Sequence, residues 1–134
     1  DCLVIVGEGA AALHAVHLAA MQRERAGATA RGLILVTPVL QPHPIPAPDD
    51  LIGLPQSIIL SPAGGPDRDT AAALAAAIDA AGSPQQMRYQ SVNAPLRLDW
   101  ALASAAIYDT VLEVARFVRR LTADCSGGQE SETF

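Results

Sequence analysis

The stretch Cys2-Leu3-Val4-Ile5-Val6-Gly7-Glu8-Gly9-Ala10-Ala11-Ala12 decides how this chain folds, and residues 13–20 continue it. Residues 2–6 are a short apolar run rich in valine and isoleucine, which is typical of a strand covered on both faces. Two glycines then allow a tight turn, and residues 10–25 contain good helix formers throughout. The stretch therefore predicts a buried strand, a glycine turn, and a helix packed closely against that strand.

The segments that follow repeat this alternation of strand and helix. Apolar runs predict strands, alanine-rich or amphipathic runs predict helices, and a proline-rich stretch separates two of the strands. The segments are a strand at 32–38, a proline segment at 38–55, strands at 56–61 and 87–92, and helices at 70–81 and 101–121. Because strands joined by helical crossovers run parallel, the order β-α-β-β-α-β-α predicts an α/β fold with a four-stranded parallel sheet and flanking helices.

Three segments carry more specific expectations. The six prolines between residues 38 and 55 exclude regular hydrogen-bonded structure there. Asp69 or Thr70 can cap the helix at 70–81 through its side-chain oxygen. The last helix has an apolar stripe that faces the core. Its members are Ile107, Val111, Val114, Val118 and Leu121.

Composition limits the class of protein. The chain has 134 residues, half of them hydrophobic. We assign residues 1–122 to one domain, or to a piece of a larger one, and 123–134 to a disordered tail. The net charge of −5 argues against nucleic acid or an anionic membrane surface as the partner. No apolar run reaches the roughly 20 residues that span a bilayer. We therefore expect a soluble protein, with the cytoplasm favoured over the periplasm.

The cysteines and histidines give no strong signal of a site. Two cysteines placed as Cys2 and Cys125 indicate neither a disulfide framework nor a metal site, so we expect a buried thiol and a free surface thiol. His14 and His17 are three residues apart on the first helix and could face one metal ion. Only Glu8 lies near them in the sequence as a third ligand, so we predict no metal and no cofactor.

The first strand predicts a partner. Residues 2–6 are as hydrophobic as the centre of a sheet, and an exposed edge of that kind would promote aggregation. We therefore expect another strand to pair with Cys2–Val6. It would come from a protein partner, from a second subunit as in a dimer, or from a missing half of the same protein.

The glycine turn fits two motifs. Gly7-x-Gly9-x-x-Ala12 matches the dinucleotide fingerprint, in which glycines let a pyrophosphate approach a helix N-terminus. However, the next strand ends at Val36-Thr37-Pro38 without the acidic residue that binds a ribose hydroxyl. Gly7-Glu8-Gly9-Ala10-Ala11 also aligns with the nucleophile elbow G-x-S-x-G, in which a strained strand-to-helix turn presents a serine.

With this elbow and this order of elements, the chain resembles the C-terminal half of the α/β-hydrolase superfamily over about residues 2–122. The proline segment stands where that family inserts its lid. Carried over onto this sequence, the resemblance implies Gly9 at the nucleophile position and Asp67 or Asp69 as the acid. It implies a histidine between Asn93 and Asp99, but the only histidines are His14, His17 and His43. A Ser-His-Asp mechanism needs all three groups, so the resemblance implies a degenerate active site.

We therefore expect a non-catalytic α/β-hydrolase-like domain, a pseudoenzyme with a binding or structural role. The backbone N–H of Ala10, at the start of the first helix, could bind a carboxylate or phosphate of a small ligand. The residues expected around the ligand are Gly9, Ala10, Asp67, Asn93 and Trp100. One alternative is an esterase- or lipase-like serine hydrolase that uses unorthodox residues or is completed by a missing N-terminal half. The other is a nucleotide-binding module built on the Gly7-x-Gly9-x-x-Ala12 motif.

Overall fold

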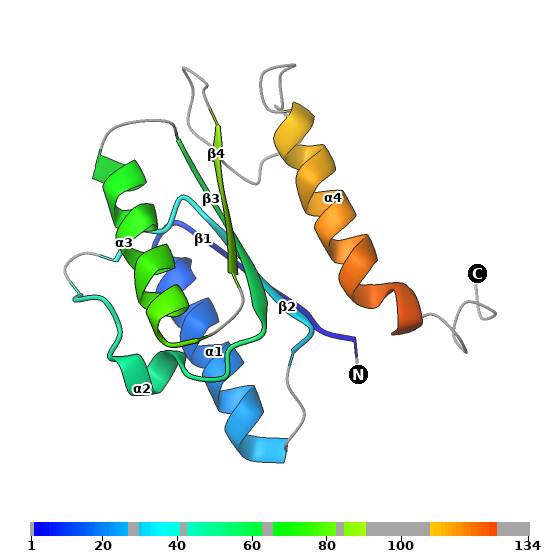
Figure 1. The fold of residues 1–134 in the computed structure, drawn as a ribbon, viewed down its shortest axis with the longest axis horizontal. Helices are drawn as coiled ribbons and strands as arrows, with labels where there is room; N and C mark the ends of the chain where they lie inside the picture. Colours follow the sequence, from blue (N-terminus) through cyan, green and yellow to red (C-terminus); the bar gives the residue numbers. More distant parts are fainter. Residues whose placement is uncertain are drawn as a thin grey trace.

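The computed structural model describes residues 2–26, 30–40, 43–62, 66–82, 85–90 and 108–125. The elements are β1 Val4–Glu8, α1 Ala11–Ala26, β2 Gly32–Val36, α2 Pro48–Leu51, β3 Gln56–Pro62, α3 Pro66–Ala80, β4 Gln85–Gln90, α4 Tyr108–Thr122 and the 3-10 helix η3 Ala123–Cys125. The four described strands form one sheet in the order β1-β2-β3-β4 (Figure 1), and every neighbouring pair is parallel. The predicted α/β fold with a four-stranded parallel sheet is confirmed.

Helices cover both faces of this sheet. Figure 1 shows α1, α2 and α3 on one face and α4 on the other. Each strand from β1 to β4 lies beside the one before it, so all the crossovers move in the same direction along the sheet. Because such crossovers are right-handed, the helices that they contain lie on the same face of the sheet. Two clusters of buried side chains result. The larger lies under α1 and α3, and the smaller lies between the sheet and α4.

Helix α4 is held on the sheet by an aromatic side chain. The predicted stripe is correct for Val114, Val118 and Leu121, which pack against the smaller cluster, while Ile107 lies outside the described residues. The centre of that cluster is Phe117, which is 1% exposed and is the bulkiest of the fully buried side chains described. The guanidinium carbon of Arg120 lies 5.7 Å from the centre of its ring, within the range of a cation–π contact.

Several predicted element boundaries are wrong by a few residues. Strand β1 continues through Gly7 and Glu8, and the predicted strand at 87–92 is observed at Gln85–Gln90. Helix α3 begins at Pro66 rather than at residue 70, because proline suits the first turn of a helix, where its missing N–H costs nothing. The proline segment contains one helical turn, α2, which also starts with a proline, Pro48. The expectation of no regular structure there is therefore wrong.

Strand β1 is the outermost strand on its side of the described sheet. The prediction that it is covered on both faces is wrong, because Val6 is 47% exposed whereas every residue of β2 is buried. The side chains of β2 are covered because β1 and β3 flank that strand and helices lie over both of its faces. The sequence of β1 resembles that of a central strand, but its position in this chain is an edge.

The two ends of the described chain are joined covalently. Cys2 and Cys125 form a disulfide with a Cα–Cα distance of 5.9 Å, so the expectation of two free thiols is wrong. Close to it, Nη1 of Arg31 contacts both carboxylate oxygens of Asp124 at 3.1 Å. Residues 123–125 are therefore ordered as η3 and are not part of a disordered tail. Residues 126–134, the rest of that predicted tail, lie outside the described residues.

Candidate functional site at the strand-to-helix turn

The turn after β1 is held by backbone hydrogen bonds from two directions. The N–H of Gly9 donates to the carbonyl of Val36 at the end of β2, with an N···O distance of 2.9 Å. The carbonyl of Gly9 accepts hydrogen bonds from the N–H of Ala12 at 3.1 Å and of Val39 at 3.0 Å. The turn is therefore tied to the neighbouring strand, to its own helix and to the segment that follows β2.

Gly7 allows α1 to lie close to the strand that precedes it. A Cβ added to Gly7 would stand 2.7 Å from Cβ of Ala15, 2.8 Å from the carbonyl oxygen of Ala11 and 2.9 Å from Cα of Ala12. Two of these three atoms belong to the helix backbone and cannot move without moving the helix. Gly7 is thus required by packing, and a glycine at this position suits both of the motifs that the sequence fits.

Gly9 has the backbone conformation of an elbow without its side chain. Its φ is +62°, in the left-handed region that glycine adopts freely and other residues adopt at a cost. A Cβ built on Gly9 would meet nothing within 4 Å, so a side chain here would project into open space. A sharp strand-to-helix turn with an outward side chain is the geometry that exposes a nucleophile in the G-x-S-x-G motif. Here the turn presents backbone only.

The acidic residues that the sequence singled out lie in the first turn of α3. Asp67 is half-buried and Asp69 is exposed, and both come after the carboxyl end of β3 in the chain. Because all four strands are parallel, this turn and Gly9 lie at the same edge of the sheet, two strand positions apart, which is roughly 10 Å across the sheet. Carboxylates in the first turn also interact favourably with the helix dipole. Asn93 and Trp100 lie outside the described residues.

The histidines lie elsewhere, and two of them, His17 and His43, line a groove beside α1. His14 and His17 are exposed on α1, and His43 is exposed in the proline segment. A cavity of about 340 Å³ separates that segment from the helix, and its lining consists of Leu13, His17, His43, Pro44, Ile45, Pro46, Ala47 and Asp50. A second cavity of about 360 Å³ shares His17 and Asp50 and extends to Ala20 and Met21. Two imidazoles and a carboxylate therefore border a mainly apolar groove.

The groove is not among the sites predicted from the sequence, although the sequence contains two signals for it. Leu13 and His17 are four residues apart on a helix and so share a face. The alternating prolines Pro44 and Pro46 keep the chain extended, so it cannot fold tightly onto that face. The groove is not the elbow site, since neither Gly9 nor Asp67 lines it. In the described part of the chain, no group of three or more histidine, cysteine, aspartate or glutamate residues could hold a metal ion.

No protein-family model matches this chain, and no curated protein matches it. Solved structures, in contrast, do match this chain. An esterase from a study of two fungal esterases of Rhizomucor miehei superposes with a TM-score of 0.72 at 15% identity, over 89% of this chain and 50% of that one. Esterase LipW from Mycobacterium marinum superposes with a TM-score of 0.70 at 18% identity, over 89% of this chain and 49% of the esterase. Brefeldin A esterase, a bacterial homologue of human hormone-sensitive lipase, superposes with a TM-score of 0.69 at 18% identity, over 90% of this chain and 48% of the esterase.

These comparisons define the class of fold. The chain has an α/β-hydrolase-like fold, as its resemblance to the C-terminal half of that superfamily implied. It spans about half the length of the esterases that it matches. None of the helices in the described ranges combines the length and the apolar character that crossing a membrane requires.

Proposed function

We propose that this chain is a non-catalytic α/β-hydrolase-like domain that binds a small anionic group, a carboxylate or a phosphate, at the turn formed by Gly9 and Ala10. The observation that carries the proposal is the backbone of Gly9, with a φ of +62° and open space where a side chain would stand. A hydrolase of this fold attacks its substrate with a side chain at such a turn. Glycine has none, so the turn can offer a ligand only its backbone groups.

The start of α1 supports binding of an anion there. Ala10 and Ala11 are exposed, and the first turn of this 16-residue helix contains no acidic residue. The N–H groups at a helix N-terminus lack partners within the helix and carry a partial positive charge, which favours a bound anion. The missing side chain at Gly9 also leaves these N–H groups accessible to a ligand.

The binding test uses inorganic phosphate and acetate as probes. Each is titrated into the ¹⁵N-labelled chain, and we expect saturable chemical-shift changes centred on the amides of Ala10 and Ala11. Gly9→Trp should abolish these changes by covering the turn. Gly82→Trp is the matched control, because Gly82 also has a positive φ and open space around its Cα but lies beyond the far end of α3. Equal binding by Gly9→Trp and the original chain would refute the proposed site.

The test of catalysis uses a fluorophosphonate probe, which labels activated serine nucleophiles. We expect the intact mass of the natively purified parent protein to be unchanged by the probe. An adduct on this chain would refute the non-catalytic role, because it would reveal an activated serine away from Gly9.

A serine hydrolase of esterase or lipase type is the second candidate, favoured by the identity of the structural neighbours, which are esterases. It would need unorthodox residues or residues supplied by a missing N-terminal half. Turnover of p-nitrophenyl acetate that disappears in Asp67→Ala but persists in Asp79→Ala would support it. Asp79 is the control because it is exposed near the opposite end of the same helix.

A nucleotide-binding module remains the third candidate, on the strength of Gly7-x-Gly9-x-x-Ala12. In open α/β sheets ligands bind where the strand order reverses, and the order β1-β2-β3-β4 runs in one direction throughout. We therefore expect NAD, FAD and ATP to leave the unfolding temperature of this chain unchanged. A concentration-dependent rise with any of them would favour this candidate over the first.

A further inference from the structure

The free side of β1 carries backbone groups that no described strand pairs. The carbonyl of Leu3 accepts a hydrogen bond from the N–H of Arg31 at 2.7 Å, and the N–H of Gly9 donates to Val36, so the odd-numbered residues of this stretch face β2. Backbone groups of successive residues in a strand point to opposite sides. The N–H and C=O groups of Val4 and Val6 therefore point away from β2, toward a side with no further strand among the described residues.

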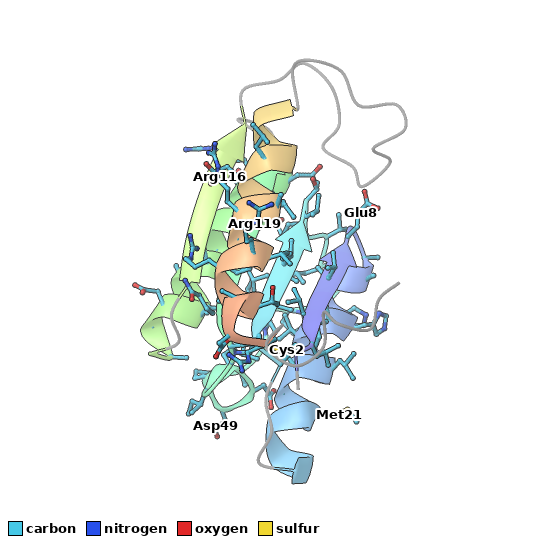
Figure 2. The ribbon with its side chains drawn as sticks, turned by 90° about the vertical axis from the view of Figure 1, so that its right-hand side faces the viewer. Cys2, Glu8, Met21, Asp49, Arg116 and Arg119 are labelled. Atoms are coloured by element: carbon cyan, nitrogen blue, oxygen red, sulfur yellow. A yellow bond between two sulfur atoms is a disulfide. The ribbon has the colours of Figure 1, made fainter. Side chains whose placement is uncertain are left out.

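The same border carries exposed apolar side chains on both faces of the sheet. Val6 is paired in register with Ile34, which belongs to the cluster under α4, yet it is 47% exposed. On the other face, Leu3 at the start of the strand and Leu18 on α1 are 43% and 44% exposed. We call Leu3, Val6 and Leu18 the β1 border. Figure 2 shows β1 between the labelled Cys2 and Glu8.

The other edge strand of the described sheet has a different sequence. Strand β4 reads Gln-Gln-Met-Arg-Tyr-Gln, which suits an edge in contact with water. Strand β1 reads Val-Ile-Val-Gly-Glu and includes neither the lysine nor the proline by which proteins protect a free edge. Parallel sheets are normally covered on both faces. The composition of β1 is therefore that of an internal strand that lacks its neighbour.

The strand order and the comparisons together indicate what that neighbour is. The described order increases steadily from β1 to β4, so a further parallel strand beside β1 would make β1 an internal strand of a longer sheet. In addition, 89–90% of this chain superposes on only 48–50% of each esterase. The remaining half of those chains has no counterpart in residues 1–134.

We propose that the β1 border binds a parallel strand from a polypeptide segment outside residues 1–134, which supplies the other half of an α/β-hydrolase-type sheet and a helix that covers Val6. This proposal does not depend on the anion site, because it rests on the edge of β1 and not on the turn. A second copy of this chain is the competing occupant. Two copies joined at β1 by a two-fold axis would pair antiparallel, so the direction of pairing distinguishes the two.

The test is site-specific photo-crosslinking in the natively expressed parent protein. p-Benzoylphenylalanine replaces Val6 or Val4, and the cross-linked peptides are mapped by mass spectrometry. We expect both positions to react with one strand outside residues 1–134, with the Val6 adduct about two residues C-terminal to the Val4 adduct, as parallel pairing requires. The same replacement at Ala76, exposed on the outer side of α3, is the control and should yield no adduct on that strand.

Three results would overturn the proposal. They are adducts within residues 2–8 of a second copy, adducts whose order runs in the antiparallel direction, and cross-linking at Val6 no greater than at Ala76. A second variant, Val6→Lys, tests the same surface with little effect on folding, because lysine is well tolerated on a half-exposed edge strand. It should leave the unfolding temperature of residues 1–134 unchanged and weaken association with the segment at least tenfold, whereas Ala76→Lys should not. Undiminished association of Val6→Lys would also overturn the proposal.

Discussion

At the scale of single residues, the two glycines after β1 have different physical roles although one motif contains both. Gly7 is required by the close packing of α1, because three atoms of that helix would lie less than 3 Å from an added Cβ. Gly9 is required by conformation, because its φ is positive while the space around it is open. Only Gly9 enters the proposed function, since a residue with a side chain there would change what the turn presents to a ligand.

We expect Gly7→Ala to lower the free energy of unfolding by about 1–3 kcal/mol, the usual cost of an added methyl group in a packed site. Ala15→Gly removes one of the three close atoms. The double variant should therefore lose less stability than the sum of the two single losses, a coupling that a double-mutant cycle measures by urea denaturation. A loss below about 0.5 kcal/mol for Gly7→Ala would show that α1 moves away without cost.

At the scale of elements, the bulkiest buried side chain that α4 places on the sheet is Phe117. One face of the sheet is covered by α1, α2 and α3, whereas on the other face α4 is the only described helix. The C-terminal part of α4 passes directly over Gly32, where an added Cβ would clash with the side chain of Leu121. Phe117 fills the space between the helix and β2 and β3. Removing its ring would leave a cavity between α4 and the sheet.

We expect Phe117→Ala to destabilise the fold by about 3–5 kcal/mol, the range typical of phenylalanine truncation in a core. Phe117→Leu should cost less, because it keeps most of the apolar volume. Arg119→Ala, at an exposed position on the same helix, is the control and should stay within about 0.5 kcal/mol of the original chain. These values come from denaturant unfolding of each variant. A loss under about 1 kcal/mol for Phe117→Ala would mean that α4 is not held through this ring.

At the scale of the whole molecule, a covalent link joins β1 to the end of α4. Cys2 and Cys125 are 123 positions apart in sequence, so their disulfide closes nearly the entire chain into one loop. The ion pair between Arg31 and Asp124 lies beside it, but both side chains are largely exposed, and pairs of this kind contribute at most about 1 kcal/mol. Disulfides persist mainly in oxidising compartments. This counts against the cytoplasmic location favoured from the sequence, which stays a prediction.

We expect reduction of this disulfide, or the double variant Cys2→Ser/Cys125→Ser, to lower the free energy of unfolding by up to about 5 kcal/mol. The reason is the conformational freedom that the unfolded chain regains when a long loop opens. Arg31→Ala should cost about 1 kcal/mol or less. Thermal unfolding with and without dithiothreitol measures both effects, and the double variant should no longer respond to the reductant. An unchanged unfolding temperature on reduction of the original chain would contradict the expected role of the link.

The candidate site could be predicted from the sequence only in part. Gly9 and Ala10 were identified correctly as the turn between a strand and a helix, because a glycine between an apolar run and helix formers is a local signal. Asp67 lies at the same edge of the sheet as Gly9 because it follows a predicted parallel strand, but its assignment as a site residue stays a prediction. The groove at His17 and His43 was missed, because its two walls are 26 residues apart in sequence and meet only in the fold.

Local sequence patterns are enough to predict the succession of strands and helices along the chain, their parallel arrangement and the glycine turn. These follow from hydrophobic periodicity and from the preferences of residues close together in the chain. It takes the folded structure to show that β1 is an edge of the described sheet, that Phe117 lies at the centre of the core under α4, and that Cys2 meets Cys125. Each of these depends on which distant segments pack together, and packing of that kind has no signature in any short stretch of sequence.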